Sequence, residues 1–171
     1  MNILIIGHAG YVGPVLIDQL IKNKKDKLIG IDTVFFKKKT LFKNKKYKNL
    51  KNIIKDVRNI SKNDLINIDA IVYLAAISND PMGNKFQKVT HEINYKSALK
   101  IANLAKKTGV KKFIFASSCS MYGFTSSLPK TEKSKLNPLT AYAKSKVLAE
   151  KKLKKISTDR FNVVCLRFAT T

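Results

Sequence analysis

The sequence predicts an α/β protein built on one parallel, doubly wound sheet of six strands. Short apolar runs alternate along the chain with segments of helical period, as strands and helices do. Strands separated by helices imply right-handed crossovers, and such crossovers build a parallel sheet with helices on both faces. At 171 residues the chain has the size of one domain. We therefore expect a single domain over residues 1–171.

The expected strands are short apolar runs, and no internal repeat or low-complexity linker interrupts them. The six runs lie at 2–6, 27–31, 52–54, 70–75, 112–117 and 161–168. The expected helices lie at 11–21, 61–66, 84–107 and 140–156. Ser61 is the expected cap of the second helix, and Gly109 ends the third. A long loop up to Pro138 precedes the last helix.

The unusual feature of the composition is its charge. Lysine and arginine number 34 against 11 aspartates and glutamates, a formal net charge of +23. Such a field attracts polyanions. The densest cluster, between Phe35 and Lys51, alternates lysines with aromatic residues, a pattern that can serve single-stranded nucleic acid. A codon bias toward lysine, asparagine and isoleucine explains the charge as well, so nucleic acid is a possible partner and not the favoured one.

Hydropathy argues against a membrane protein. No apolar run is long enough to cross a bilayer, and the run 1–6 lacks the basic segment and cleavage site of a signal peptide. We therefore expect a cytoplasmic protein with no membrane partner. Cys119 and Cys165 fit neither a metal-ligand spacing nor a disulfide framework. We expect no metal site, and thiols that are reduced and partly buried.

Three glycines form the first turn between a strand and a helix. Gly7, Gly10 and Gly13 are spaced G-x-x-G-x-x-G. Glycines allow a tight turn and a close approach to a pyrophosphate, and the helix N-terminus attracts phosphates. Glycines also serve ordinary turns, but Asp32 ends the second strand about 20 residues on, where an acid holds the adenosine ribose. The pattern predicts dinucleotide binding, with NAD favoured over NADP because a carboxylate repels a 2′-phosphate.

Tyr142 and Lys146 are four residues apart on the last expected helix and so lie on the same face. An ammonium held near a phenol favours the phenolate and lowers the tyrosine pKa from about 10. Tyr142 would then be a usable proton shuttle. A packed ring four residues before a solvated lysine is also common, so the interpretation depends on the rest of the chain.

These pieces resemble the N-terminal, nucleotide-binding part of extended short-chain dehydrogenases/reductases, in the NAD-dependent epimerase/dehydratase branch that includes UDP-glucose 4-epimerase. They follow the family's order and approximate spacing from Asn2 to the end of the chain. The matching pieces are Gly7/Gly10/Gly13, Asp32, Asp56-Val57-Arg58, Tyr73-Leu74-Ala75-Ala76, Asn94, the run from Ser117 to Gly123, Tyr142 with Lys146, and Leu166-Arg167-Phe168. The resemblance implies a Rossmann-type NAD-binding domain.

The resemblance also implies roles for single residues. The implied catalytic set is Ser118, Tyr142 and Lys146. The implied cofactor-binding residues are Gly7, Gly10, Tyr11, Val12, Gly13, Asp32, Asp56, Val57, Leu74, Ala75, Ala76, Asn94, Tyr142 and Lys146. The glycine turn would hold the pyrophosphate with the amides of residues 11 and 12, and residues 56 and 57 would flank the adenine. Residues 74–76 would form a wall beside the cofactor, and residue 94 would support the site geometry.

Each of these positions has a structural alternative. Asp56 could cap a turn, and residues 74–76 could be plain buried strand. Asn94 could be a solvated helix residue, and Ser118 could merely end a strand. The sequence alone leaves these alternatives open.

The implied chemistry is that of an NAD-dependent nucleotide-sugar epimerase. Tyr142 as phenolate takes a proton from a sugar hydroxyl while hydride leaves the same carbon, and the transient ketone takes the hydride back on its other face. Ser118 would hydrogen-bond the sugar oxygen, and Lys146 would bind the nicotinamide ribose. An NAD-dependent sugar-nucleotide oxidoreductase is the near variant. A non-catalytic binding module, with RNA as a candidate ligand, is the alternative from another class.

Two departures from the family pattern sharpen this hypothesis. Cys119 and Ser120 stand where sugar-nucleotide 4,6-dehydratases carry an Asp-Glu pair, and neither can replace a carboxylate. Dehydration is therefore not expected. His8 stands where a small residue is common, and we expect a solvated loop histidine.

The largest departure is length. Extended members continue into a seventh strand and a C-terminal substrate-binding region, which we expect this chain to lack. A sheet that ends at strand six should fold but expose apolar surface. Most contacts to the nucleotide-sugar substrate would come from the missing part, so activity of the chain alone is open. A homodimer through the helices at 84–107 and 140–156 is possible, although their apolar positions serve the protein's own sheet equally well.

Overall fold

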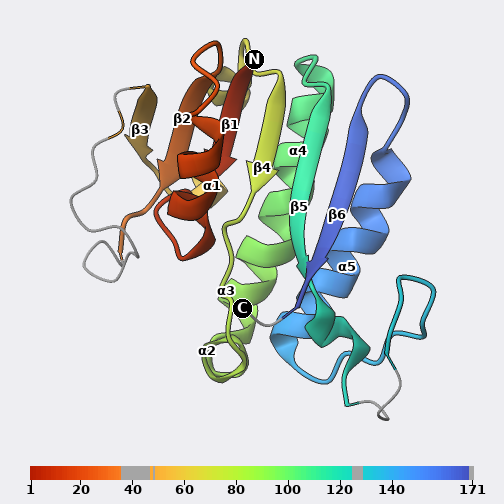
Figure 1. Cartoon of the computed structure of the whole chain (residues 1–171). Coiled ribbons are helices and arrows are strands. Elements are labelled where there is room, and N and C mark those ends of the chain that lie inside the picture. Colours follow the sequence, from red (N-terminus) through yellow and green to blue (C-terminus); the bar gives the residue numbers. More distant parts are fainter. Residues whose placement is uncertain (36–46, 48, 125–128, 170–171) are drawn as a thin grey trace.

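The structure is a computed structural model that describes residues 1–35, 47, 49–124 and 129–169. Its centre is a six-stranded sheet in the order β3-β2-β1-β4-β5-β6 (Figure 1). The strands are β1 (Asn2–Ile6), β2 (Lys27–Asp32), β3 (Leu50–Ile54), β4 (Ala70–Tyr73), β5 (Lys112–Ser118) and β6 (Asn162–Phe168). Every pairing is parallel. The predicted doubly wound parallel sheet is confirmed, with the strand order reversing between β1 and β4.

The helices differ from the predicted ones mainly between residues 80 and 107. They are α1 (Val12–Leu20), α2 (Asp80–Lys85), α3 (Gln87–His91), the π-helical η4 (Glu92–Ser97), α4 (Ala98–Lys107) and α5 (Ala141–Ile156), with the 3₁₀ turns η2 (Val57–Asn59), η3 (Lys62–Leu65) and η5 (Cys119–Tyr122). The single helix expected at 84–107 begins earlier because the Asn79 side chain caps α2 by accepting the Met82 N–H, 2.9 Å away. It is then broken at Phe86, whose backbone is not helical.

Helices lie on both faces of the sheet. α1 covers one face beside β1 and β2, whereas α4 and α5 cover the other face beside β4, β5 and β6 (Figure 1). Right-handed crossovers that run in opposite directions from the centre of the sheet require this arrangement. The larger core lies on the α4 and α5 side; among its buried members are Leu4, Ile6, Ile71, Tyr73, Phe113, Phe115, Ile101, Ala105, Ala149 and Leu153. The smaller core, under α1, contains Ile3, Ile5, Ile17 and Leu28.

The face of β6 that points away from the larger core is exposed to solvent. Val164, Leu166 and Phe168 alternate with residues that pack against the larger core, and they expose 42%, 42% and 39% of their surface. No described helix covers this end of the sheet on the α1 side (Figure 1). The expected exposed apolar surface at strand six is therefore present.

Three further expectations concern composition. Most of the lysine and aromatic segment between Phe35 and Lys51 lies outside the described residues. Within the described ranges no helix is long and apolar enough to span a bilayer. The same ranges hold no group of side chains arranged for a metal ion, and Cys119 and Cys165 are free and partly buried.

Candidate active site

The glycine turn lies where β1 meets α1, and two of its glycines are required by close contacts. Gly7 has φ +86°, a backbone conformation that favours glycine, and a Cβ there would collide with the backbone of Ala75. A Cβ at Gly13 would collide with the carbonyl oxygen of His8. Gly10 donates its N–H to the Gly7 carbonyl at 3.3 Å and has more room. The turn therefore keeps its backbone bare at the N-terminus of α1, where amides and helix dipole favour an anion.

Asp32 ends β2 directly beside this turn. Its Oδ2 accepts the Ala9 N–H at 3.1 Å, and its Oδ1 accepts the Val34 N–H at 2.8 Å. The carboxylate is only partly buried. Asp32 therefore lies beside the glycine turn, as predicted, and its carboxylate keeps lone pairs available for hydroxyl groups.

His8 is not the solvated loop residue that we predicted. It is 6% exposed, and its Nε2 lies 2.8 Å from Oδ1 of Asn52 on β3. The ring packs against Gly30 of β2, where a Cβ would collide with it. The expectation was wrong because Gly30, on the neighbouring strand, has no side chain and so leaves room for the His8 ring. The local sequence around His8 does not show this space.

Asp56 and Val57 are engaged within the protein. The Asp56 carboxylate accepts the Arg58 N–H at 2.8 Å and pairs with the Arg58 guanidinium at 2.7 Å. The hydrogen bonds from Arg58 hold the Asp56 pKa below its usual range. Val57 is 7% exposed and belongs to the larger core. Asp56 thus caps η2, as the structural alternative proposed, and the adenine contacts stay a prediction.

The end of β4 passes directly in front of the glycine turn. β4 ends at Tyr73, and the amides of Leu74 and Ala75 both donate to the Ile6 carbonyl, at 2.8 and 3.0 Å. Gly7 packs on the backbone of the same two residues. Residues 74–76 are therefore partly buried chain beside the turn, and the strand that was expected to reach residue 75 ends earlier because the chain bends there.

Asn94 is fully buried and joins two segments. Its Oδ1 accepts the Ile77 N–H at 2.9 Å, and its Nδ2 donates to the Ile77 carbonyl and to Oγ of Ser145, each at 3.1 Å. It lies on η4, and π-helical turns of this kind are frequent at functional sites. The alternative that Asn94 is a solvated helix residue is wrong. Asn94 holds the segment after β4 against α5 through Ser145, the residue before Lys146.

Tyr142 and Lys146 share a face of α5, but their charges differ from the expected ones. Lys146 is 2% exposed, its Nζ donates to the Ala116 carbonyl at 2.7 Å, and burial lowers its pKa to about 7. Its Nζ also lies 5.6 Å from the centre of the Tyr142 ring. The pKa of Tyr142 is raised rather than lowered, because burial outweighs a hydrogen bond with Ser118, and the charges of Asp80 and Cys119 add to the rise.

The expected lowering of the Tyr142 pKa is thus wrong for the protein without ligands. A lysine with a pKa near 7 carries only part of its charge at neutral pH. One N–H of its ammonium is also donated to the Ala116 carbonyl of β5. Helical spacing predicted the shared face and could not predict this burial.

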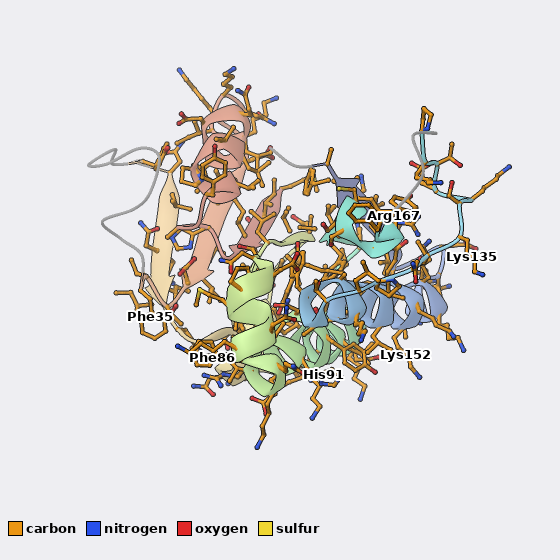
Figure 2. The ribbon with its side chains drawn as sticks, turned by 90° about the horizontal axis from the view of Figure 1, so that it is seen from below. Phe35, Phe86, His91, Lys135, Lys152 and Arg167 are labelled. Atoms are coloured by element: carbon orange, nitrogen blue, oxygen red, sulfur yellow. The ribbon has the colours of Figure 1, made fainter. Side chains whose placement is uncertain are left out.

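Ser118 completes the candidate set at the end of β5. Its Oγ accepts the Ser120 N–H at 3.2 Å and so caps η5, and its side chain is near enough to Tyr142 to lower the pKa of that phenol. Ser118 therefore caps η5, as the structural alternative proposed, and also lies near Tyr142, as the implied catalytic set requires. Figure 2 shows the edge at which β5 and β6 end, with Arg167 beside the teal turn of η5.

Sequence reasoning gave no role to a buried ion pair next to this set. Glu150 of α5 pairs with Arg167 of β6 at 2.8 Å, and their side chains are 6% and 9% exposed. One signal was available. Glu150 follows Tyr142 and Lys146 at successive steps of four, so all three share the buried face of the helix, and a buried carboxylate requires a partner.

A family model described as the NAD dependent epimerase/dehydratase family matches residues 3–171. The chain belongs to this family. Its curated relatives include an uncharacterised UDP-glucose epimerase of Bacillus subtilis, 33% identical over 184 residues that cover 99% of this chain and 56% of that protein. They also include the UDP-glucose 4-epimerase of Lactobacillus helveticus, 31% identical over 154 residues, 88% of this chain and 46% of that protein.

Solved structures of the family agree with the fold. The UDP-N-acetylglucosamine 4-epimerase of Methanobrevibacter ruminantium superposes with a TM-score of 0.87 at 26% identity, over 97% of this chain and 54% of that one. The UDP-glucuronic acid 4-epimerase of Bacillus cereus, solved in complex with NAD, gives 0.85 at 26% identity, over 99% and 56%. This family member thus spans about half the length of the relatives that it matches.

Proposed function

We propose that the chain is the NAD-binding, catalytic-residue-bearing part of a nucleotide-sugar epimerase. The observation that carries the proposal is one continuous set of contacts from the glycine turn to the candidate catalytic residues. Gly7 packs on the end of β4, the segment after β4 is bound to Asn94, and Asn94 is bound to Ser145 beside Lys146. A dinucleotide site and a Tyr/Lys/Ser set on one rigid edge are what transient oxidation of a bound sugar requires.

The residues around the turn fit NAD. Gly7 and Gly13 leave open the space that side chains would fill, the amides at the start of α1 suit a pyrophosphate, and Asp32 suits the adenosine ribose. Asp32 disfavours a 2′-phosphate, so NAD is preferred over NADP. When bound, NAD supplies a hydride acceptor that can also return the hydride. The solved Bacillus cereus relative, in complex with NAD, supports this choice.

Three residues would handle the substrate hydroxyl and its proton. Tyr142 would accept the proton, Ser118 would hold the sugar oxygen, and Lys146 would supply positive charge. A bound ribose whose hydroxyls accept hydrogen bonds from Lys146 would favour its ammonium form, and that charge would in turn favour the Tyr142 phenolate. The relatives named as UDP-glucose 4-epimerases support a UDP-hexose as substrate, with epimerisation favoured over net oxidation.

Calorimetric titration of the purified chain with NAD tests the cofactor part of the proposal. The chain is first checked for cofactor already bound. We expect Asp32→Ala to weaken binding about tenfold or more, because the ribose hydroxyls lose their acceptor. Asp159→Ala, which removes an exposed carboxylate at another site, should bind as the unaltered chain does. A folded, cofactor-free chain that binds no NAD would contradict the proposal.

Nucleic acid binding is a second candidate, and the distribution of charge favours it. The outer surfaces of α4 and α5 carry exposed lysines: Lys100, Lys106, Lys107, Lys144, Lys151, Lys152 and Lys155. The acid of α5, Glu150, is buried and neutralised by Arg167 and Lys154. Binding of a single-stranded RNA through this surface should fall steeply between 50 and 200 mM salt, on the order of 10³-fold if six or more phosphates are contacted. NAD binding should barely respond, and salt-insensitive or absent RNA binding would eliminate this candidate.

The same lysines bear on the homodimer expected through the long helices. Two copies packed along α4 and α5 would bring like charges together, which opposes association at low salt. The dimer stays a prediction of the resemblance alone.

A further inference from the structure

The ion pair of Glu150 and Arg167 has the geometry of a fixed clamp. Arg167 Nε donates to Oε2 of Glu150 at 3.2 Å, and its Nη2 donates to Oε1 at 2.8 Å. Burial raises the pKa of Glu150, but the hydrogen bonds from Arg167 and Lys154 outweigh it and hold that pKa below its ordinary value. A two-pronged pair of this kind fixes distance and direction together.

On one side the pair holds the residue before Ser118. Ser117 Oγ donates to Oε2 of Glu150 at 3.1 Å, and Ser117 is 3% exposed. This bond ties the last residues of β5 to α5. Glu150 lies eight residues after Tyr142 on the same helix, so it connects the strand of Ser118 with the helix of Tyr142.

On the other side the pair holds the turn after Ser118. Arg167 Nη1 donates to the Tyr122 hydroxyl at 2.8 Å, and its guanidinium carbon lies 5.3 Å from the centre of the Tyr122 ring. Tyr122 ends η5, the turn that Ser118 caps. The loop before α5 is held too, because Tyr122 Oη donates to the Thr131 carbonyl at 2.9 Å and Arg167 Nη1 to the Glu132 carbonyl at 3.1 Å.

We infer that Glu150 and Arg167 are positioning residues that hold Ser118 against Tyr142. The pair contacts the residue before Ser118, the turn after it and the helix that carries Tyr142, so it fixes Ser118 from three sides. Global stability is a weaker explanation, because a buried ion pair costs desolvation that roughly offsets its attraction. The inference rests on the proposed function only in treating Ser118 and Tyr142 as working partners.

The ionisation of Tyr142 tests this inference, because positioning and simple charge predict opposite signs. Removing a carboxylate removes negative charge, which by itself favours the phenolate and lowers the Tyr142 pKa. Releasing Ser118 removes the influence of its side chain, which favours the phenolate, and so raises the Tyr142 pKa. We therefore expect Glu150→Ala to raise the Tyr142 pKa by about half a unit or more.

The shift is measured by NMR of tyrosine labelled with ¹³C at Cζ, titrated with the chain free of NAD and assigned with Tyr142→Phe. Glu150→Gln, which keeps oxygen and shape, should shift the pKa less than Glu150→Ala. Lys154→Ala removes the exposed arm of the network, 59% exposed, and should leave Tyr142 unchanged at 0.15 M salt.

An unchanged or lowered Tyr142 pKa in folded Glu150→Ala would overturn the inference. If that variant does not fold, Ser117→Ala decides, since it cuts one bond without changing charge: a rise in the pKa supports positioning and no change overturns it. The titration needs no cofactor, so absence of NAD binding by the unaltered chain would contradict the proposed function and leave this test intact.

Discussion

The nucleotide half and the catalytic half of the candidate site are built in different ways. Around Gly7 and Gly13 the site is formed by backbone atoms that pack so closely that no side chain fits at these two positions. Around Tyr142 it is made of buried polar side chains, whose charges depend on their neighbours. A backbone site follows from spacing in the sequence, whereas a side-chain site depends on burial that only the folded chain defines. The three predictions below test this contrast, from the largest expected effect to the smallest.

Gly13→Ala should have the largest effect because the new Cβ would collide with the carbonyl of His8. We expect a loss of about 3 kcal/mol in the free energy of unfolding, together with loss of NAD binding. Urea unfolding and calorimetric titration measure the two. Gly10→Ala is the matched control for the unfolding measurement, since its Cβ would meet its nearest atom, the Gly7 carbonyl oxygen, at 3.4 Å. Equal losses in the free energy of unfolding for the two variants would mean that the turn is not fixed by close packing.

Lys146→Met probes the catalytic half through the dependence of stability on pH. Folding lowers the Lys146 pKa from 10.5 to about 7, so between these values the unfolded chain binds more protons and stability rises with pH. The variant lacks this group. Relative to it, the unaltered chain should gain about 2 kcal/mol in the free energy of unfolding between pH 7 and pH 9. Urea unfolding at several pH values checks this, and parallel curves would show that Lys146 is solvated.

The same contrast explains how far the sequence could lead. The alternation of apolar runs and helical segments predicted the six parallel strands, because burial on both faces leaves a clear mark in such strands. The spacing of residues also predicted that Asp32 lies at the glycine turn and that Tyr142 shares a helix face with Lys146. These are properties of local geometry.

Other features depend on contacts between segments that are distant in sequence. His8 is buried because Gly30, on the neighbouring strand, makes room for it. Asn94, on the π-helical turn after the break at Phe86, is buried where it bonds Ile77 and Ser145, which are 17 and 51 residues away in the sequence. The roles of Glu150 and Arg167 need the register of α5 against β6. No local pattern encodes these pairings, so a sequence without its fold could not predict them.

Asp80→Asn should have the smallest effect and sharpens the account of the Tyr142 charge. Asp80 lies at the start of α2, and its negative charge is one of the causes that raise the Tyr142 pKa. Removing that charge should lower the pKa by about 0.3 unit, because Asp80 is exposed and its field is screened by solvent. The same ¹³C tyrosine titration measures it, and Asp159→Asn, whose carboxylate is not among the causes of the shift, is the control. A shift that vanishes at 1 M salt would confirm a through-space field, whereas an unchanged Tyr142 pKa would leave burial as the main reason that this phenol resists ionisation.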